Sequence, residues 1–63
     1  MSHTSRYYKL KSLANLLQEE NKIIERMAFN EDLPIFDAEL ERGLKSSYYN
    51  LIQQVSELKN ELF

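Results

Sequence analysis

The last third of the chain carries an apolar ladder whose members are spaced four, three, four, three and four residues apart. These residues are Leu44, Tyr48, Leu51, Val55, Leu58 and Leu62. Such a/d spacing is typical of a helix whose apolar seam faces another helix. The ladder therefore predicts an all-α fold and assigns its six residues to the helix-packing core, but it indicates no particular activity.

A single proline, Pro34, marks the one turn-like segment, at residues 30–34. The residue before a proline disfavours the helical conformation, so a helix should end before Leu33. Pro34 itself suits the first turn of a new helix. We predict a first helix over about residues 4–29, a turn over about 30–33 and a second helix over about 34–62. The short connection makes them antiparallel neighbours in one domain, 1–63.

The predicted first helix has a broad apolar side. At about 100° per residue, an arc of about 200° holds its apolar residues, twice the stripe that one neighbouring helix requires. The surplus predicts two neighbours, the second helix and a helix of another chain, and hence a dimeric four-helix bundle. A homodimer or a heterodimer fits this surplus. We assign the core of the first helix to the centre of the arc, at Leu10, Leu13, Leu17 and Ile24.

The charges are distributed in a way that favours the hairpin. Residues 1–17 carry Arg6, Lys9 and Lys11 and no acid, a net charge of +3, whereas residues 18–63 carry five cations and ten acids, a net charge of −5. Folding the chain at residues 30–34 brings the basic start of the first helix next to Glu57 and Glu61. Each exposed ion pair contributes at most about 1 kcal/mol, so the pairs set orientation more than stability.

The residue types that most enzyme sites require are scarce in this sequence. Cysteine is absent, His3 is the single histidine and Gly43 is the single glycine, which leaves no thiolate ligand set and no glycine-rich phosphate loop. The Glu-x-x-His motif of di-metal bundles is missing too. We therefore expect no enzymatic activity, no metal and no cofactor. No apolar run approaches the roughly 20 residues of a membrane span, and no export signal is recognisable, so we expect a cytoplasmic protein without a membrane partner.

Gly43 lies inside the predicted second helix, where glycine is about 1 kcal/mol less favourable than alanine. Three interpretations stay open. The glycine is simply tolerated, or it allows a neighbouring helix to approach closely, or it divides a short helix at 34–42 from a longer one at 44–62.

Four side chains are the candidates for contact with a partner protein. Tyr8 and Tyr49 project away from the predicted seams, and exposed tyrosine is enriched at interfaces. Leu16 and Ile23 fall about 100–120° to one side of Leu17 on the helical wheel. The resulting hypothesis is a non-enzymatic regulator, inhibitor or assembly factor that binds itself and another protein through a helix face.

Two alternatives belong to other classes. Arg6, Lys9 and Lys11 are interleaved with aromatic residues, a pattern found in nucleic-acid-binding proteins, although the acid-rich remainder disfavours phosphate. In length and hairpin plan the chain resembles the Rop family of small dimeric RNA-binding bundles, which is a precedent for the architecture. A Rop-like nucleic-acid binder that uses these three cations is the alternative function. The third possibility is a structural subunit of a larger complex.

Overall fold

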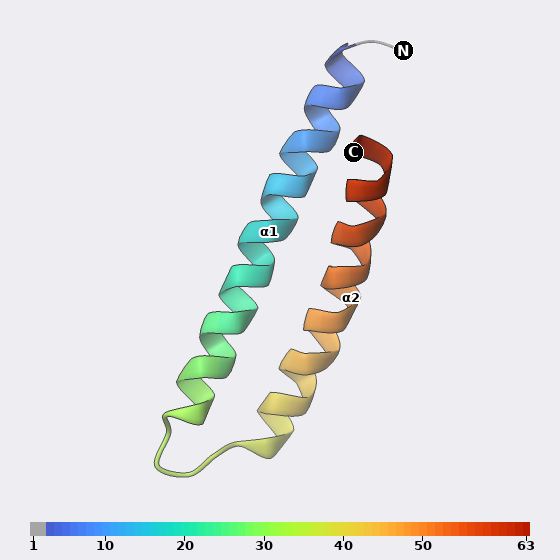
Figure 1. The fold of residues 1–63 in the computed structure, drawn as a ribbon. Helices are drawn as coiled ribbons and strands as arrows, with labels where there is room; N and C mark the ends of the chain where they lie inside the picture. Colours follow the sequence, from blue (N-terminus) through green and yellow to red (C-terminus); the bar gives the residue numbers. More distant parts are fainter. Residues whose placement is uncertain (1–2) are drawn as a thin grey trace.

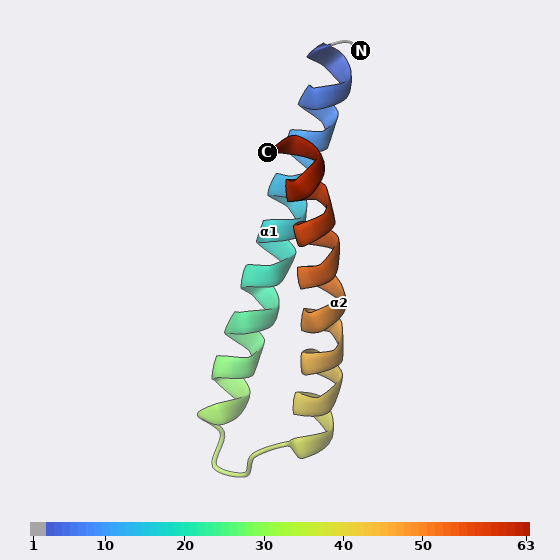
Figure 2. The ribbon, with the colours of Figure 1, turned by 45° about the vertical axis from the view of Figure 1, so that its right-hand side comes forward.

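The computed structural model describes residues 3–63, with side chains from Ser5 onward, as a two-helix hairpin. Helix α1 spans His3–Glu31 (29 residues) and helix α2 spans Ala38–Leu62 (25 residues). The helices run antiparallel and side by side along a rod with extents of 52 × 14 × 13 Å (Figures 1 and 2). The first turns of α1 extend beyond the end of α2 (Figure 1). The predicted all-α helical hairpin is confirmed.

Helix α2 begins at Ala38, four residues later than the sequence predicted, and α1 continues to Glu31. The reason is the N-cap. Asp37 has an extended backbone, with φ −94° and ψ 97°, and its Oδ1 accepts a hydrogen bond from the Leu40 backbone N–H at 3.0 Å. An aspartate in this position satisfies one of the unpaired N–H groups of the first helical turn. Pro34 therefore lies in the turn and not in the first turn of α2.

A fully buried polar side chain, Asn30, joins the two helices next to the turn. Its Nδ2 donates to the Asp37 carbonyl oxygen at 2.9 Å and to Glu41 Oε1 at 3.2 Å. Its Oδ1 accepts from the Asp37 backbone N–H at 3.2 Å. The amide thus uses both donors and its acceptor, which is what a buried polar group needs to avoid an unfavourable desolvation.

The side of α2 that faces α1 carries the predicted ladder. Leu44, Val55 and Leu62 are buried, and the other three ladder residues are half-buried. Val55 and Leu62 form the centre of the core together with Leu13 of α1. Because α2 has one apolar stripe with a regular spacing, its orientation follows directly from the sequence.

The side of α1 that faces α2 lies to one side of the centre of the predicted apolar arc. The buried and half-buried positions recur every three or four residues, at Leu13, Leu16, Glu20, Ile23, Met27 and Asn30. Leu16 and Ile23, which the sequence analysis assigned to a partner protein, therefore pack within the hairpin. Leu10, Leu17 and Ile24, which were assigned to the core, are exposed in the single chain. The helical-wheel prediction was centred on the part of α1 with the most apolar residues. The surface of α1 that packs against α2 contains two polar residues, Glu20 and Asn30.

Helix α2 is continuous through Gly43. A Cβ atom placed on Gly43 meets nothing within 4 Å, so no neighbouring helix of this chain approaches it closely. Of the three interpretations, the division into two helices is wrong, and within the chain the glycine is simply tolerated.

The open end of the hairpin is held by charged groups. Lys9 Nζ lies 3.0 Å from Glu61 Oε1, and Arg6 Nη1 donates to the Leu62 carbonyl oxygen at 2.9 Å. Arg6 also lies over the Phe63 ring, 5.9 Å from its centroid. A guanidinium at the C-terminal end of α2 satisfies a free carbonyl and is favoured by the helix macrodipole. The predicted proximity of the basic start of α1 and the acidic end of α2 is confirmed for these groups.

Candidate interaction surface

A second seam, which we call the open row, runs along α1, and none of the side chains described from Ser5 onward covers it. Its six residues are again spaced four, three, four, three and four apart, and all are exposed: Leu10, Ala14, Leu17, Asn21, Ile24 and Ala28. The three large side chains keep 39%, 41% and 43% of their surface exposed, in chain order. An a/d rhythm with exposed aliphatic residues is the pattern of a helix that lacks its partner helix.

The open row borders a shallow groove between the helices. Glu20, which lies three residues after Leu17 and four before Ile24, lines this groove from α1. Residues from the second half of α2 line the other wall: Ile52, Val55, Ser56, Lys59 and Asn60. Because residues three and four apart are neighbours on a helix, the open row and Ile52 lie on one side of the rod. We call this side, which also includes the exposed Tyr49 three residues before Ile52, the apolar face.

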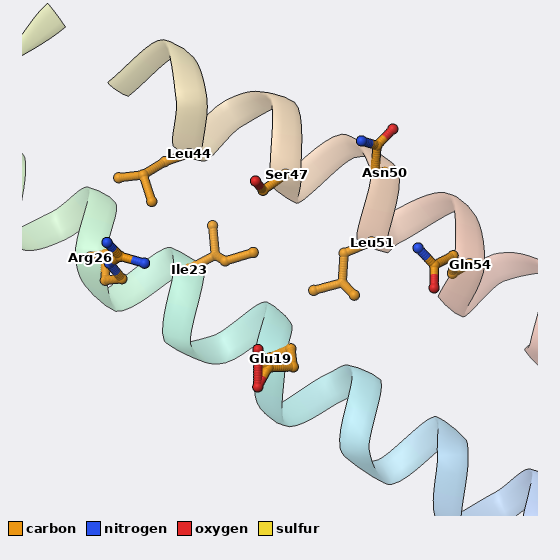
Figure 3. Close-up of a pocket in the computed structure, with 8 residues that line it drawn as sticks. All are labelled: Glu19, Ile23, Arg26, Leu44, Ser47, Asn50, Leu51 and Gln54. Atoms are coloured by element: carbon orange, nitrogen blue, oxygen red, sulfur yellow. The ribbon is translucent and has the colours of Figure 1, made fainter. Parts of the chain in front are cut away.

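The opposite side of the rod is polar. Glu19 and Arg26 lie two residues away from Leu17 and Ile24, which corresponds to about 160° around the helix. They line a second groove of about 410 Å³ together with Ser47, Asn50 and Gln54 of α2. Figure 3 shows Ile23, Leu44 and Leu51 pointing toward one another between the helices in this region. The hairpin therefore presents one apolar face and one polar face.

The two predicted tyrosine anchors are exposed, but they do not form one surface with the other candidates. Tyr8 lies in the first turns of α1 and packs edge-on against Tyr7, with ring centroids 5.3 Å apart. Tyr49 lies in the middle of α2 and packs in the same way against Tyr48, at 5.8 Å. Tyr8 is two residues from Leu10 and so lies about 160° around α1 from the open row.

The three cations proposed for nucleic-acid contact already have neighbours within the chain. Lys9 pairs with Glu61, and Arg6 bonds the Leu62 carbonyl. Lys11 lies over the Tyr7 ring, with Nζ 5.8 Å from the centroid. A phosphate contact would have to compete with these interactions.

Sequence reasoning missed an exposed apolar tip at the turn. Ile35 keeps 84% of its surface exposed, and Phe29 and Phe36 are also exposed. Glu31 and Asp32 give the same tip a negative charge. The residues Ile35 and Phe36 were visible in the sequence, but the prediction placed them inside the second helix, which it began at Pro34. A prediction that placed the N-cap of this helix at Asp37 would have left Ile35 and Phe36 in a loop.

Metal-binding and membrane-spanning features were also sought in the described part of the chain. Residues 3–63 contain no group of three or more histidine, aspartate or glutamate side chains arranged to hold a metal ion. Neither α1 nor α2 combines the length and the apolarity that crossing a membrane requires. Comparison with models of known protein families, with curated proteins and with solved structures finds no match to this chain.

Proposed function

We propose that this chain is a non-enzymatic protein-binding module, a small regulator, inhibitor or assembly factor, that docks through its apolar face. The observation that carries the proposal is the open row, in which three exposed aliphatic side chains follow helical spacing along α1. A contiguous exposed apolar surface on a small domain marks an interaction site. Docking of one helix face against another is a common mode of protein recognition.

The first protein proposed for this face is a second copy of the chain, which would complete a dimeric four-helix bundle. The core of one hairpin is small, because its buried apolar residues are Leu13, Leu44, Val55 and Leu62. A core of this size supplies little stability in a chain without disulfides, and oligomerisation is a common remedy. Pairing through the apolar face would enlarge the core without changing the hairpin.

The partner protein is proposed to bind outside the paired faces. Tyr8, Phe29 and Ile35 are exposed and are not part of the open row. They would stay accessible after two copies have paired, since Tyr8 lies on the far side of α1 and Ile35 lies in the turn. Of the four predicted anchors, the proposal retains Tyr8 as a partner-binding residue and assigns Tyr49 to the dimer interface. A cytoplasmic location remains part of the proposal.

The test of pairing is the molar mass of the purified chain, measured by light scattering across a concentration series. We expect a dimer for the native chain and a monomer for Leu17→Glu, because a carboxylate in the centre of the open row would be desolvated on pairing. Tyr8→Ser is the control, since it removes a large exposed side chain from the other side of α1, and it should remain a dimer. A monomeric native chain would contradict the proposed bundle.

The test of partner binding uses the dimer itself as bait in a lysate of the source cells. The native dimer should retain a specific protein, and the triple variant Tyr8→Ser, Phe29→Ser, Ile35→Ser should lose it while keeping its dimeric mass. Retention of the same protein by this variant would show that these side chains are not the binding surface.

A further inference from the structure

We infer that two copies pair with their α1 helices antiparallel about a two-fold axis that crosses α1 near residue 19. This inference rests on the proposed function, because it specifies how the apolar face is occupied by a second copy. Four features of the chain agree with this arrangement: the size pattern of the open row, its flanking charges, the charges of the rod's two ends, and the position of Ile52.

The first feature is the alternation of side-chain size along the open row. Large residues alternate with alanine or asparagine throughout its length. In the antiparallel pair, a residue of one copy lies beside the residue of the other copy whose number brings the sum to 38. Each large residue then contacts a smaller one: Leu10 contacts Ala28, Ile24 contacts Ala14 and Leu17 contacts Asn21. A parallel pairing in register would place leucine against leucine and alanine against alanine, which leaves voids in alternate layers. Facing large and small residues fill the interface at native density.

The second feature is the charge pattern at the edge of the row. Lys11, Gln18 and Glu25 each follow one of the large residues, and so line one edge of the row at seven-residue intervals. In the antiparallel arrangement, Lys11 lies level with residue 27 of the second copy, which is about 3 Å along the axis from Glu25. Glu25 accepts a hydrogen bond from Asn21 of the row at 3.5 Å, which holds the carboxylate near the interface. A parallel two-fold pairing would place this edge of the two copies on opposite sides of the interface, where Lys11 and Glu25 do not meet.

The third feature is the opposite charge of the two ends of the rod. At the open end, α1 carries Arg6, Lys9 and Lys11, of which Lys9 is already paired with Glu61 of α2, whereas the tip carries Glu31 and Asp32. Antiparallel α1 helices bring the tip of each copy to the basic end of the other. The attraction occurs twice in the dimer, as a two-fold symmetric interface requires.

The fourth feature is the position of the apolar residues of α2. The contacts at both ends of the hairpin join residues whose numbers sum to about 70, namely Lys9 with Glu61 and Asn30 with Glu41. A two-fold axis near residue 19 therefore crosses the level of residue 51 on α2. There Ile52 of one copy faces Tyr49 of the other. The same axis thus matches apolar residues on both helices, although it was placed from α1 alone.

The exposed area is also of the right size for this interface. The hairpin exposes 5053 Å². A compact monomer of 7.5 kDa exposes roughly 4,250 Å². The difference is about 800 Å², which is close to what each partner buries in an interface of standard size.

The absence of cysteine from the sequence makes a crosslinking test specific. Gln18→Cys places a thiol at the edge of the row close to the two-fold axis, so a short bismaleimide should join two copies of this variant. Lys11→Cys alone should not crosslink, because its two thiols would lie about 24 Å apart along the axis. A mixture of Lys11→Cys and Glu25→Cys should yield a covalent heterodimer, identified by mass spectrometry.

Each result of this experiment has a separate meaning. Crosslinking of Lys11→Cys with itself would show a parallel pairing and overturn the inference. A chain that is dimeric by mass but gives no Gln18→Cys crosslink would also overturn it and leave the proposed bundle intact. A monomeric chain would contradict the bundle itself. Circular dichroism of each variant verifies that the helices are retained.

Charge reversal provides a second measurement without a crosslinker. Lys11→Glu and Glu25→Lys should each weaken dimerisation roughly three- to tenfold, because two exposed pairs turn repulsive. The double variant should return to within about twofold of the native dissociation constant. Lys22→Glu, on the polar side of α1, is the matched control and should leave dimerisation unchanged. Failure of the double variant to recover would contradict the predicted contact.

Discussion

Asn30 and Asp37 exchange two hydrogen bonds across the turn, one to the Asp37 carbonyl oxygen at 2.9 Å and one from its backbone N–H at 3.2 Å. The last turn of α1 is thereby fixed against the residue that caps α2. Because the amide side chain binds the backbone of Asp37 and leaves its carboxylate free for the cap, the two roles of Asp37 can be separated by mutation.

We expect Asn30→Ala to be the most destabilising single substitution near the turn. It removes three hydrogen bonds and takes their partner from the Asp37 backbone N–H and from the half-buried Glu41 carboxylate, while the Asp37 carbonyl keeps its bond from the Glu41 N–H. We expect the free energy of unfolding to fall by roughly 2–3 kcal/mol. Urea denaturation at a fixed chain concentration measures the loss, since dimerisation makes stability depend on concentration. Asn15→Ala, at an exposed position of the same helix, is the control. An equal effect of both substitutions would show that the network adds nothing.

We expect Asp37→Ala to reduce stability by about 1 kcal/mol, the usual effect of losing an N-cap side chain. The loss should be smaller than that of Asn30→Ala, because the backbone groups of Asp37 still bond Asn30. Asp37→Ser should recover most of the loss, since a serine hydroxyl also accepts from the N–H of the first turn. Thermal unfolding followed by circular dichroism ranks the three proteins. A serine variant as unstable as the alanine variant would argue against a capping role.

We expect Gly43→Ala to stabilise the chain by about 1 kcal/mol. The added methyl group meets nothing within 4 Å, and alanine has the higher helix propensity. Gly43 lies one residue before the buried Leu44, on the exposed side of α2. The midpoint of urea unfolding should therefore increase while the molar mass stays the same. A decrease in either quantity would indicate that another chain packs against this glycine.

We expect Glu20→Leu to stabilise the hairpin by roughly 1 kcal/mol. Glu20 is half-buried in the seam between the helices, at a position where an apolar side chain would remove more surface from water. The gain is limited because the position is only partly covered. Chemical denaturation measures it, and Glu19→Leu on the polar side of α1 is the matched control. A loss of stability would show that the carboxylate has a favourable role in the seam.

The fold was predictable because α2 has a single apolar stripe. Its ladder indicated a helix and the residues that face α1. The orientation of α1 was not predictable in the same way, because its broad apolar arc contains two seams that run side by side, one through Leu13 and one through Leu17. Hydrophobicity alone favoured the seam with Leu10, Leu17 and Ile24. The seam that α1 uses contains Glu20 and Asn30, which a hydrophobic pattern counts as unfavourable.

The start of α2 was mispredicted for a related reason. Pro34 and Asp37 both carry signals for the beginning of a helix, since proline suits the first turn and aspartate suits the N-cap. The structure uses Asp37, whose backbone is bonded by Asn30 from the other helix. A tertiary hydrogen bond of this kind is invisible to local sequence reasoning. The exposed tip at Ile35 follows from the same choice.

The unequal strength of the two ends of the hairpin has a consequence for its motions. At the turn, a buried amide and a covalent connection hold the helices together. At the open end, beyond the core cluster of Leu13, Val55 and Leu62, the helices are joined by the Arg6–Leu62 hydrogen bond and by the Lys9–Glu61 pair, which is about half exposed and contributes at most about 1 kcal/mol. Opening should therefore begin at the termini and proceed toward the turn. In hydrogen-exchange measurements, the backbone amides of residues 5–12 and 56–63 should lose protection first. The two helices would then separate transiently at their terminal ends while the contacts next to the turn stay formed.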